Sequence, residues 1–267
     1  MTIKGLNGIV NKTLIRTTLQ RLISRYGVEV LIVDAYGWMH AGKSITGVVE
    51  LLSCGHPCPP LYHFFERRLS TISLRGKLRV WLVFDGPSSL QKESTEDERE
   101  KQRKERRDAG LEAQKNGQYA KATPLLRNAT EITPTIAKGV IDHLNALPVE
   151  RKRQIGLARC VVSINEADPL LSHLNWLLPN SCVISRDYDM VPWNTKMCCF
   201  KVDYNSGLVH LYMREVFDVS AVVSRKILQL TQEQLIDCCV MAGCDYVKSL
   251  KDVGFITAAG LIREHGN

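Results

Sequence analysis

The chain has 267 residues, with 35 Lys and Arg against 28 Asp and Glu, which gives a formal charge of +7 at pH 7. This surplus of positive charge is compatible with a polyanionic partner. No apolar run approaches the length of a transmembrane helix, and the N-terminus has no secretory hydrophobic region, so we expect no membrane partner. Nine cysteines without a CxxC pair are typical of reduced thiols in the nucleus or cytosol.

Four apolar runs are predicted to be buried strands. They are LIVDA at 31–35, VWLVFDG at 80–86, the stretch 160–164, and CVIS just before Arg186. Continuous apolar strands that alternate with helical patterns predict an α/β fold with a mostly parallel central sheet flanked by helices. Carboxylates follow these runs or lie near the end of the chain: Asp34, Asp85, Glu166, Asp168, Asp187, Asp189 and Asp245.

These seven acids have two interpretations. The carboxyl ends of parallel strands line one crevice, so acids placed there converge although they are far apart in sequence. Carboxylate oxygens in such numbers suit Mg²⁺ or Mn²⁺. The alternative is that each acid merely caps the helix that follows it. Two D/E-x-D pairs and two solitary strand-end acids favour the metal site over capping alone.

A charged helix is predicted over residues 92–115, followed by helices over 117–129 and 133–145, the last with a cap at Thr133-Pro134. The charged helix could simply be a solvated surface with paired charges. Its middle is strongly basic, which suits contact with a phosphate backbone. The basic residues there are Arg99, Lys101, Arg103, Lys104, Arg106 and Arg107.

Five motifs carry a resemblance to a known family. They are VDAYGWMH (33–40), VFDG (83–86), NEAD (165–168), RDYD (186–189) and AGCDY (242–246). Together they resemble the structure-specific 5′ nucleases, the superfamily of flap endonucleases and exonuclease 1, and within it the chain looks most like exonuclease 1. The resemblance implies a PIN-like or resolvase-like nuclease core with an inserted helical arch and a C-terminal helix-hairpin-helix-like element. The expected regions are 1–90 for the N-terminal nuclease part, 91–147 for the arch and its cap, and 148–267 for the internal nuclease part.

The resemblance also implies roles for individual residues. All seven acids would bind two Mg²⁺ ions, which Mn²⁺ could replace, and would thus take part in catalysis. Lys92 and Arg99 would reach the scissile phosphate from the arch. Tyr36 would stack on a terminal base and His40 would lie near a phosphate, although a Tyr- and Trp-rich helix start could equally be core packing. Arg103, Lys104, Arg106 and Arg107 are the remaining expected DNA contacts.

Two features depart from the family or extend it. Asp252 stands where the family has a Gly in the hairpin that binds duplex DNA. A residue other than Gly reaches the conformation of that turn less easily. The negative charge of Asp252 would also repel phosphate. Arg151-Lys152-Arg153 is expected in an extra loop, where it could touch DNA or be solvated.

Two further interpretations compete with a nuclease. Residues 37–44 satisfy G-x-x-x-x-G-K-S, the pattern of a P-loop NTPase, but Trp38, Met39 and His40 resemble a packed helix more than a phosphate cradle. The chain could also be a catalytically inactive nucleic-acid-binding module of the same fold. Crowded acids would then only add repulsion, which argues against that alternative.

The sequence therefore predicts a Mg²⁺-dependent 5′ nuclease, a 5′-3′ exonuclease, a 5′-flap endonuclease or both, which hydrolyses DNA phosphodiesters by a two-metal mechanism in replication or repair. The expected partner is DNA with a free 5′ end or a 5′ flap. We expect a monomer in the nucleus, with the mitochondrion or cytoplasm as alternatives.

Overall fold

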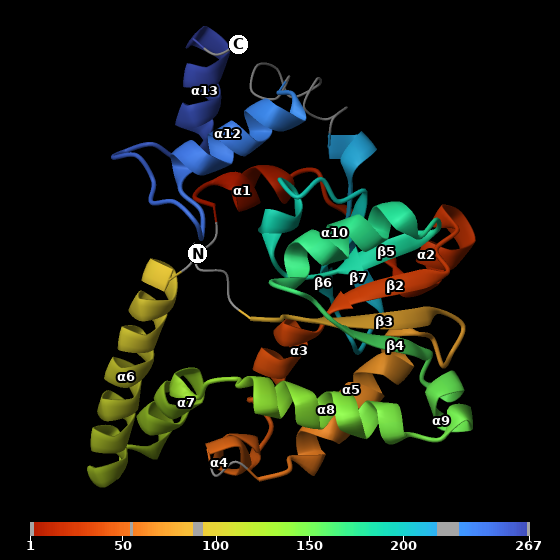
Figure 1. Ribbon diagram of the computed structural model, residues 1–267, viewed down its shortest axis with the longest axis vertical. Coiled ribbons are helices and arrows are strands. Elements are labelled where there is room, and N and C mark those ends of the chain that lie inside the picture. Colours follow the sequence, from red (N-terminus) through yellow and green to blue (C-terminus); the bar gives the residue numbers. More distant parts are fainter. Residues whose placement is uncertain (1–2, 54–55, 88–92, 218–229, 266–267) are drawn as a thin grey trace.

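The centre of the molecule is a seven-stranded sheet of order β1-β7-β6-β5-β2-β3-β4. Figure 1 shows it in the computed structural model, which describes residues 3–53, 56–87, 93–217 and 230–265. Neighbouring strands from β6 through β5, β2 and β3 to β4 run parallel, whereas β7 is antiparallel to both β6 and β1. The strands are β1 (Ile15–Thr18), β2 (Val30–Asp34), β3 (Arg79–Phe84), β4 (Leu157–Val162), β5 (Ser181–Ile184), β6 (Met197–Val202) and β7 (Leu208–Met213). The predicted mostly parallel sheet is confirmed.

Both faces of the sheet are buried, because successive side chains of a strand point to opposite faces. In β2, Leu31 and Val33 enter one core cluster, and Val30 and Ile32 enter the other. All four are no more than 3% exposed. A strand that is apolar at every position can exist only where helices cover both sides of the sheet.

Helices supply that cover on each face. The first cluster takes side chains from α2 (Leu19–Tyr26), α3 (Ala35–Gly42), α4 (Val48–Ser53), α5 (Pro59–Ile72) and α8 (Pro134–Ala146). The second takes them from α1 (Leu6–Val10), α10 (Ala167–Leu177), α12 (Gln232–Ala242) and α13 (Phe255–His265). In Figure 1, α10 and α1 lie above the central strands, and α3, α5 and α8 lie below them.

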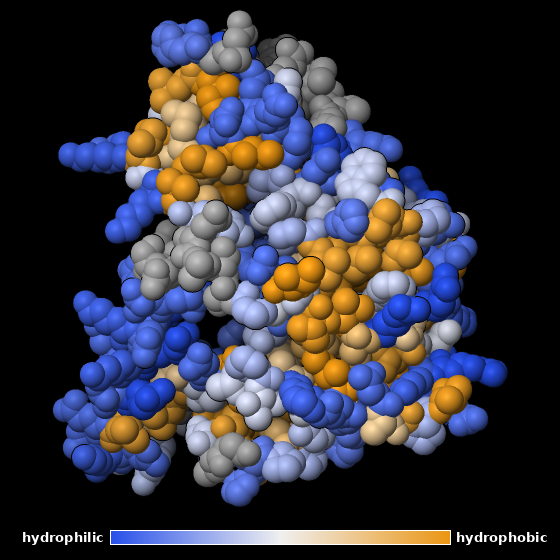
Figure 2. Space-filling model, in the orientation of Figure 1, coloured by the Kyte–Doolittle hydropathy of each residue, from blue (hydrophilic) through white to orange (hydrophobic). Residues whose placement is uncertain are grey.

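An arm of two helices projects from this core. It consists of α6 (Glu93–Lys115) and α7 (Tyr119–Ala129), which pack against each other. A Cβ at Gly110 of α6 would lie 2.8 Å from Leu126 of α7, so glycine permits their close approach. Figure 2 shows α6 as hydrophilic almost throughout, while apolar side chains gather over β3, β4 and α10. The predicted insertion boundaries at 91 and 147 stay predictions.

Of the local structures predicted from the sequence, the helix cap at Thr133 is confirmed and the loop at residues 151–153 is wrong. The cap at Thr133 is present, since its hydroxyl accepts from the backbone N–H of Ile136 and Pro134 begins α8. The basic triplet at 151–153 was expected in a loop but lies in a short helix, α9 (Val149–Gln154), which begins after Pro148. Asp252 does reach the left-handed region, with φ 61°, which Asp tolerates better than most residues. No helix in the described part of the chain is long and apolar enough to cross a membrane.

Candidate metal-dependent nuclease site

The predicted acids lie at one edge of the sheet, close to the carboxyl ends of its parallel strands. Asp34 ends β2 and Asp85 follows β3. Glu166 and Asp168 open α10 after β4, and Asp187 and Asp189 form the turn η2 (Tyr188–Met190) after β5. Asp245 lies in the loop after α12. We call these seven residues the acid edge.

The acids influence one another electrostatically. Burial, followed by the charge of Asp85, raises the pKa of Asp34 to about 6. Burial and then the charges of Asp187 and Asp245 raise the pKa of Asp189 to about 7. Such shifts between residues from different strands require that the carboxylates lie close together in space.

Asp168 lies within the same field. Burial raises the pKa of its carboxyl well above the usual range, followed by the charges of Asp187, Asp34, Asp85 and Asp189. Four carboxylates from three other segments therefore act on this single group. An edge of this kind favours added positive charge.

Hydrogen bonds show that several of these acids also cap local structure. Asp34 Oδ1 accepts from the backbone N–H groups of Tyr36 (3.0 Å) and Gly37 (3.3 Å). Asp187 Oδ1 accepts from the N–H of Asp189 at 2.9 Å. Asp85 Oδ1 accepts from the first N–H of α10, that of Ala167, at 2.7 Å. Capping fixes the orientation of these carboxylates, and a carboxylate has enough lone pairs both to cap a helix and to bind a cation.

Two polar neighbours of the acids were not singled out from the sequence. The hydroxyl of Tyr246 donates to Glu166 Oε2 at 2.6 Å, and that of Ser185 donates to Asp34 Oδ2 at 3.3 Å. Tyr246 directly follows Asp245 in the AGCDY motif, and Ser185 ends CVIS, so their positions beside the acids were the available signal. Both hydroxyls help to orient the carboxylates to which they donate.

The donor set fits a hard divalent cation. Oδ1 of Asp189 is buried and has no hydrogen-bond partner, which indicates an oxygen that an ion or water could use. Among the described residues, no group of three or more His, Cys, Asp or Glu side chains is arranged so that it could already hold a metal ion. Mg²⁺ commonly keeps several waters and takes only one or two carboxylates directly, so an open ring of acids is compatible with it.

One basic residue of α6 reaches the acid edge. Arg99 donates from Nη2 to Asp245 Oδ2 at 2.8 Å and also pairs with Glu96 of its own helix. His40 of α3 is exposed, and its pKa is lowered to about 4 by partial burial and then by the nearby charges of Lys43, Arg99 and Arg103. The imidazole is therefore neutral at neutral pH, so His40 could approach a phosphate only as a hydrogen-bonding group.

The other predicted DNA contacts lie at different places on the arm and the core. Arg103 lies on the same side of α6 as Arg99 and is 3.8 Å from Glu131. Arg107 lines a cavity of about 1050 Å³ between α4 and the α6–α7 arm. Lys104 and Arg106 are exposed and are not brought to the acid edge, and Arg106 donates to Gln102. Tyr36 is half-buried against the first core cluster. Lys92 lies outside the described residues.

The structure contradicts the interpretation of residues 37–44 as a P-loop. Residues 35–42 form the helix α3, so their N–H groups do not wrap around a ligand. Lys43, which would contact phosphates in a P-loop, is buried and donates to the carbonyl of Thr130 at 2.8 Å. This residue instead ties the core to the segment between α7 and α8.

Comparisons with known proteins agree with this site. The XPG I-region family matches residues 158–245, a segment that contains five of the seven acids. Exodeoxyribonuclease 1 of Saccharomyces cerevisiae is 29% identical over 244 residues, which are 90% of this chain and 32% of that protein. Flap endonuclease 1 of Eremothecium gossypii is 26% identical over all of this chain and 67% of its own length. These matches support a similarity of this chain to the superfamily of structure-specific 5′ nucleases.

Solved structures of the superfamily share the fold. The catalytic core of Rad2 in complex with a DNA substrate has a TM-score of 0.66 at 18% identity and covers 99% of this chain and 69% of its own. Human GEN1 in complex with Holliday junction DNA has a TM-score of 0.62 at 15% identity, with 98% and 55% covered. A third structure, GEN1 with product DNA and a Mg²⁺ ion, has a TM-score of 0.59 at 15% identity, with 98% and 51% covered. The chain spans about a third of the length of the exonuclease relative.

Proposed function

We propose that this protein is a Mg²⁺-dependent structure-specific 5′ nuclease that hydrolyses DNA phosphodiesters. The observation that carries the proposal is the placement of acids from five segments at one edge of the sheet, where several of them raise one another's pKa. Crowded carboxylates repel one another, and a group of this kind is typical of a cation site. The similarity to structure-specific 5′ nucleases and the DNA bound in the related solved structures support DNA as the substrate.

The acids would divide between two ions. Asp34, Asp85, Glu166 and Asp168 would hold one, directly or through water, and Asp187, Asp189 and Asp245 the other. The chemistry supplied by two bound Mg²⁺ ions is activation of an attacking water and stabilisation of the leaving oxygen. The Mg²⁺ ion in the GEN1 structure supports magnesium as the metal.

The arm supplies the positive charge on the opposite side of the substrate. Arg99, now paired with Asp245, would exchange that carboxylate for the scissile phosphate and offset its developing charge. Lys92 would act beside it. Tyr36 and the neutral His40 would contact the terminal nucleotide, and Arg103 would lie along the same path. Arg107 and the exposed Lys104 and Arg106 would contact phosphates further along α6.

A 5′-3′ exonuclease, a 5′-flap endonuclease, or both activities fit this arrangement, and their use in replication or repair belongs to the same proposal. So do a monomeric state and a nuclear location. The thiols of the described cysteines are free, which agrees with a reducing compartment. The division into residues 1–90, 91–147 and 148–267 is part of the proposal too.

Cleavage of an internally labelled duplex with a recessed 5′ end or a 5′ flap tests the proposal, with Mg²⁺ and with chelator. We expect products only with the metal, and Asp187→Ala should lower the rate by at least about 10²-fold, as for other groups that stabilise transition-state charge. Folding and DNA binding should be largely retained. Asp142→Ala is the matched control, because Asp142 is exposed and forms a surface ion pair with Lys138.

Two results would overturn parts of this proposal. Near-normal cleavage by Asp187→Ala would remove that residue from the metal site. If the wild-type chain bound DNA tightly but made no metal-dependent product, the inactive binding module would be the better description. Product lengths separate exonuclease from flap cleavage.

A further inference from the structure

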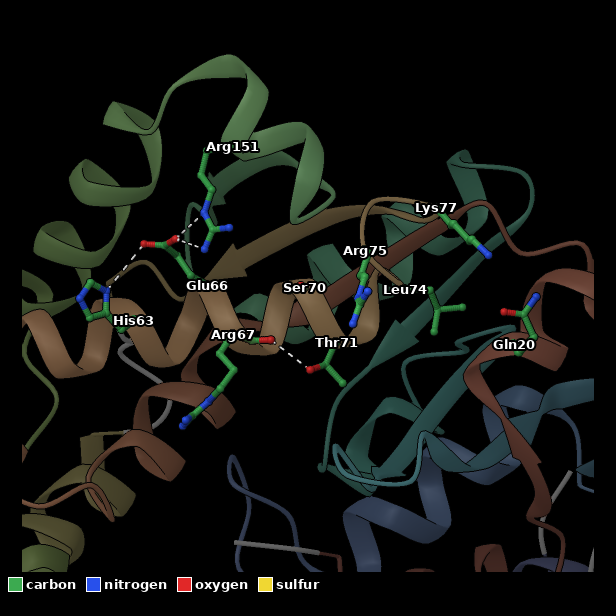
Figure 3. Close-up of a pocket in the computed structure, with 10 residues that line it drawn as sticks. All are labelled: Gln20, His63, Glu66, Arg67, Ser70, Thr71, Leu74, Arg75, Lys77 and Arg151. Atoms are coloured by element: carbon green, nitrogen blue, oxygen red, sulfur yellow. Dashed lines mark hydrogen bonds and ion pairs between the residues drawn. The ribbon is translucent and has the colours of Figure 1, made fainter.

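A second polar cavity lies away from the acid edge. It has a volume of about 890 Å³ and is formed by the C-terminal half of α5, the turn that follows it, α2 and α9 (Figure 3). The turn precedes β3 and α9 precedes β4, so the cavity lies toward the amino ends of these strands, whereas Asp85 and Glu166 follow their carboxyl ends. Figure 1 shows α9 across the molecule from α6. The cavity is therefore distinct from the candidate nuclease site.

The cavity carries a surplus of positive charge. Arg67, Arg75 and Lys77 line it, are exposed, and make no ion pair with any residue that the structure describes. Among its described lining residues the only carboxylate is Glu66, which Arg151 already neutralises. Three cations are thus available to a ligand.

Contacts between its walls hold the cavity in shape. Arg151 of α9 donates to Glu66 Oε2 of α5 at 2.8 Å, and His143 of α8 lies 3.0 Å from Oε1 of the same carboxylate. Figure 3 shows Glu66 between Arg151 and His63, on the side of α5 that faces α9. The positive wall formed by α9 is therefore fastened to α5 before any ligand arrives, which reduces the entropy lost on binding.

The turn after α5 is fixed as well. Leu74, Arg75 and Gly76 have φ of 52°, 58° and 86°, a left-handed conformation that is uncommon for Leu and Arg. A Cβ on Gly76 would lie only 2.3 Å from the carbonyl oxygen of Arg153, so the turn lies directly against the end of α9. Strained backbone of this kind persists only where the surrounding structure holds it, and it is concentrated at functional sites.

The lining chemistry indicates which ligand would be bound. Guanidinium and ammonium groups stand beside the hydroxyls of Ser70 and Thr71 and the amide of Gln20, which are the donor types that contact nucleic-acid phosphates. Leu74 is the only aliphatic side chain among the described lining residues. Small organic ligands are usually enclosed by apolar walls, and protein partners use buried aromatic or aliphatic anchors, so both fit this cavity poorly.

We propose that this cavity binds the phosphate backbone of a second segment of DNA, separate from the segment held at the acid edge. Arg75 and Lys77 from the turn and Arg67 from α5 would contact successive phosphates. Contacts of this type are independent of base sequence. They weaken as the salt concentration rises, because the release of counterions from the DNA on binding is then less favourable. The basic residue Arg151, singled out in the sequence as a possible DNA contact, would act by fixing the cavity wall.

The double variant Arg75→Glu/Lys77→Glu tests the proposal. The probe is a covalently closed circular duplex, which offers no 5′ end, and binding is measured in chelator over a range of salt concentrations. We expect affinity to fall at least about tenfold at low salt and the slope of log K against log salt to drop by roughly 0.9 for each lost phosphate contact. The control Arg25→Glu/Lys201→Glu makes the same change in net charge at two exposed sites outside the cavity and should have a far smaller effect.

The outcomes separate this inference from the proposed function. Equal losses in the two double variants, or no loss in the cavity variant, would overturn it. A competition experiment gives another test. If polyglutamate displaced the bound DNA as effectively as competitor DNA of equal charge, the inference would be overturned and an acidic protein partner would be indicated. Thermal unfolding checks the fold, and the single variant Arg67→Glu provides a second measurement if the double variant is destabilised. Cleavage of a short flap substrate should be unchanged in the cavity variants, so a failure of one idea leaves the other standing.

Discussion

Glu66 and the carboxylates of the acid edge are both removed from solvent, but their pKa values shift in opposite directions. Glu66 is 8% exposed, and burial alone would raise its pKa, yet hydrogen bonds from His143 and Arg151 lower it. At the acid edge, burial and neighbouring acids act in the same direction, and the pKa values of Asp34 and Asp189 rise. Burial raises the pKa in both places, so the direction of the net shift depends on whether the neighbouring groups oppose burial or add to it.

This difference separates a structural ion pair from a candidate site. The fold supplies Glu66 with the guanidinium of Arg151 from α9 and the imidazole of His143 from α8, so the carboxylate is satisfied within the chain. At the acid edge, Arg99 of the arm pairs with Asp245, while Asp34, Asp168 and Asp189 are acted on by other carboxylates. A crowded group of acids is where an external cation gains most.

The largest expected effect in this comparison is on cleavage. Arg99→Ala should slow single-turnover cleavage at saturating enzyme by about 10²-fold, because it removes positive charge that acts on the reacting phosphate. DNA affinity should change far less. Lys92→Ala is expected to act in the same direction.

Arg106→Ala is the control for the arm. Arg106 lies on the same helix but is exposed and bonded only to Gln102 among the described residues. If both arginine variants slowed cleavage equally, the arm would act through its overall charge, and the contact between Arg99 and Asp245 would carry no special role.

A smaller effect is expected on stability at Glu66. Glu66→Gln should lower the free energy of unfolding by about 2 kcal/mol, because it leaves Arg151 without its buried anion. Urea unfolding at neutral pH measures this. Glu29→Gln is the matched control, since Glu29 is exposed and lies 3.9 Å from Arg79, and should cost less than about 1 kcal/mol. Equal effects would contradict the distinction between buried and exposed pairs.

The same pair has a defined dependence on pH. The pKa of Glu66 is lower in the folded protein than in the unfolded chain, so the ionised carboxylate stabilises the fold above its ordinary range. That contribution is lost as the pH falls through the folded pKa. The difference in stability between wild type and Glu66→Gln should therefore be largest near neutral pH and shrink in acid.

The smallest effect should have the opposite sign. In chelator, Asp189→Asn should raise the free energy of unfolding by roughly 1 kcal/mol, because it removes one of several crowded charges. With Mg²⁺ present, the wild type should gain more stability than the variant, since binding to the folded state stabilises it.

Asp203→Asn is the control for charge crowding. Asp203 is fully exposed in a turn, where the hydroxyl and N–H of Ser206 and the N–H of Asn205 hold its pKa below the usual value. Its replacement should bring no gain in stability. A loss of stability in Asp189→Asn in chelator would show that its hydrogen bonds matter more than its charge.

Much of the fold could be predicted because its signals are local. The apolar runs near Asp34 and Asp85 became β2 and β3, and the Thr133-Pro134 cap began α8 where expected. The loop expected at 151–153 was wrong, since a six-residue helix has too few positions to show a clear apolar period. The roles of the individual acids, of Lys92 and of the arm arginines stay predictions.

The sequence by itself determined the strand positions and the acids that follow them, because strand period and chain order are written in adjacent residues. Only the tertiary structure decided which charges meet. Arg99 and Asp245 are 146 residues apart, and Arg151 and Glu66 are 85 apart, yet one pair joins the arm to the acid edge and the other fixes the second cavity. Such pairs depend on how helices pack in three dimensions. Local sequence patterns do not predict which residues far apart in the chain will come into contact.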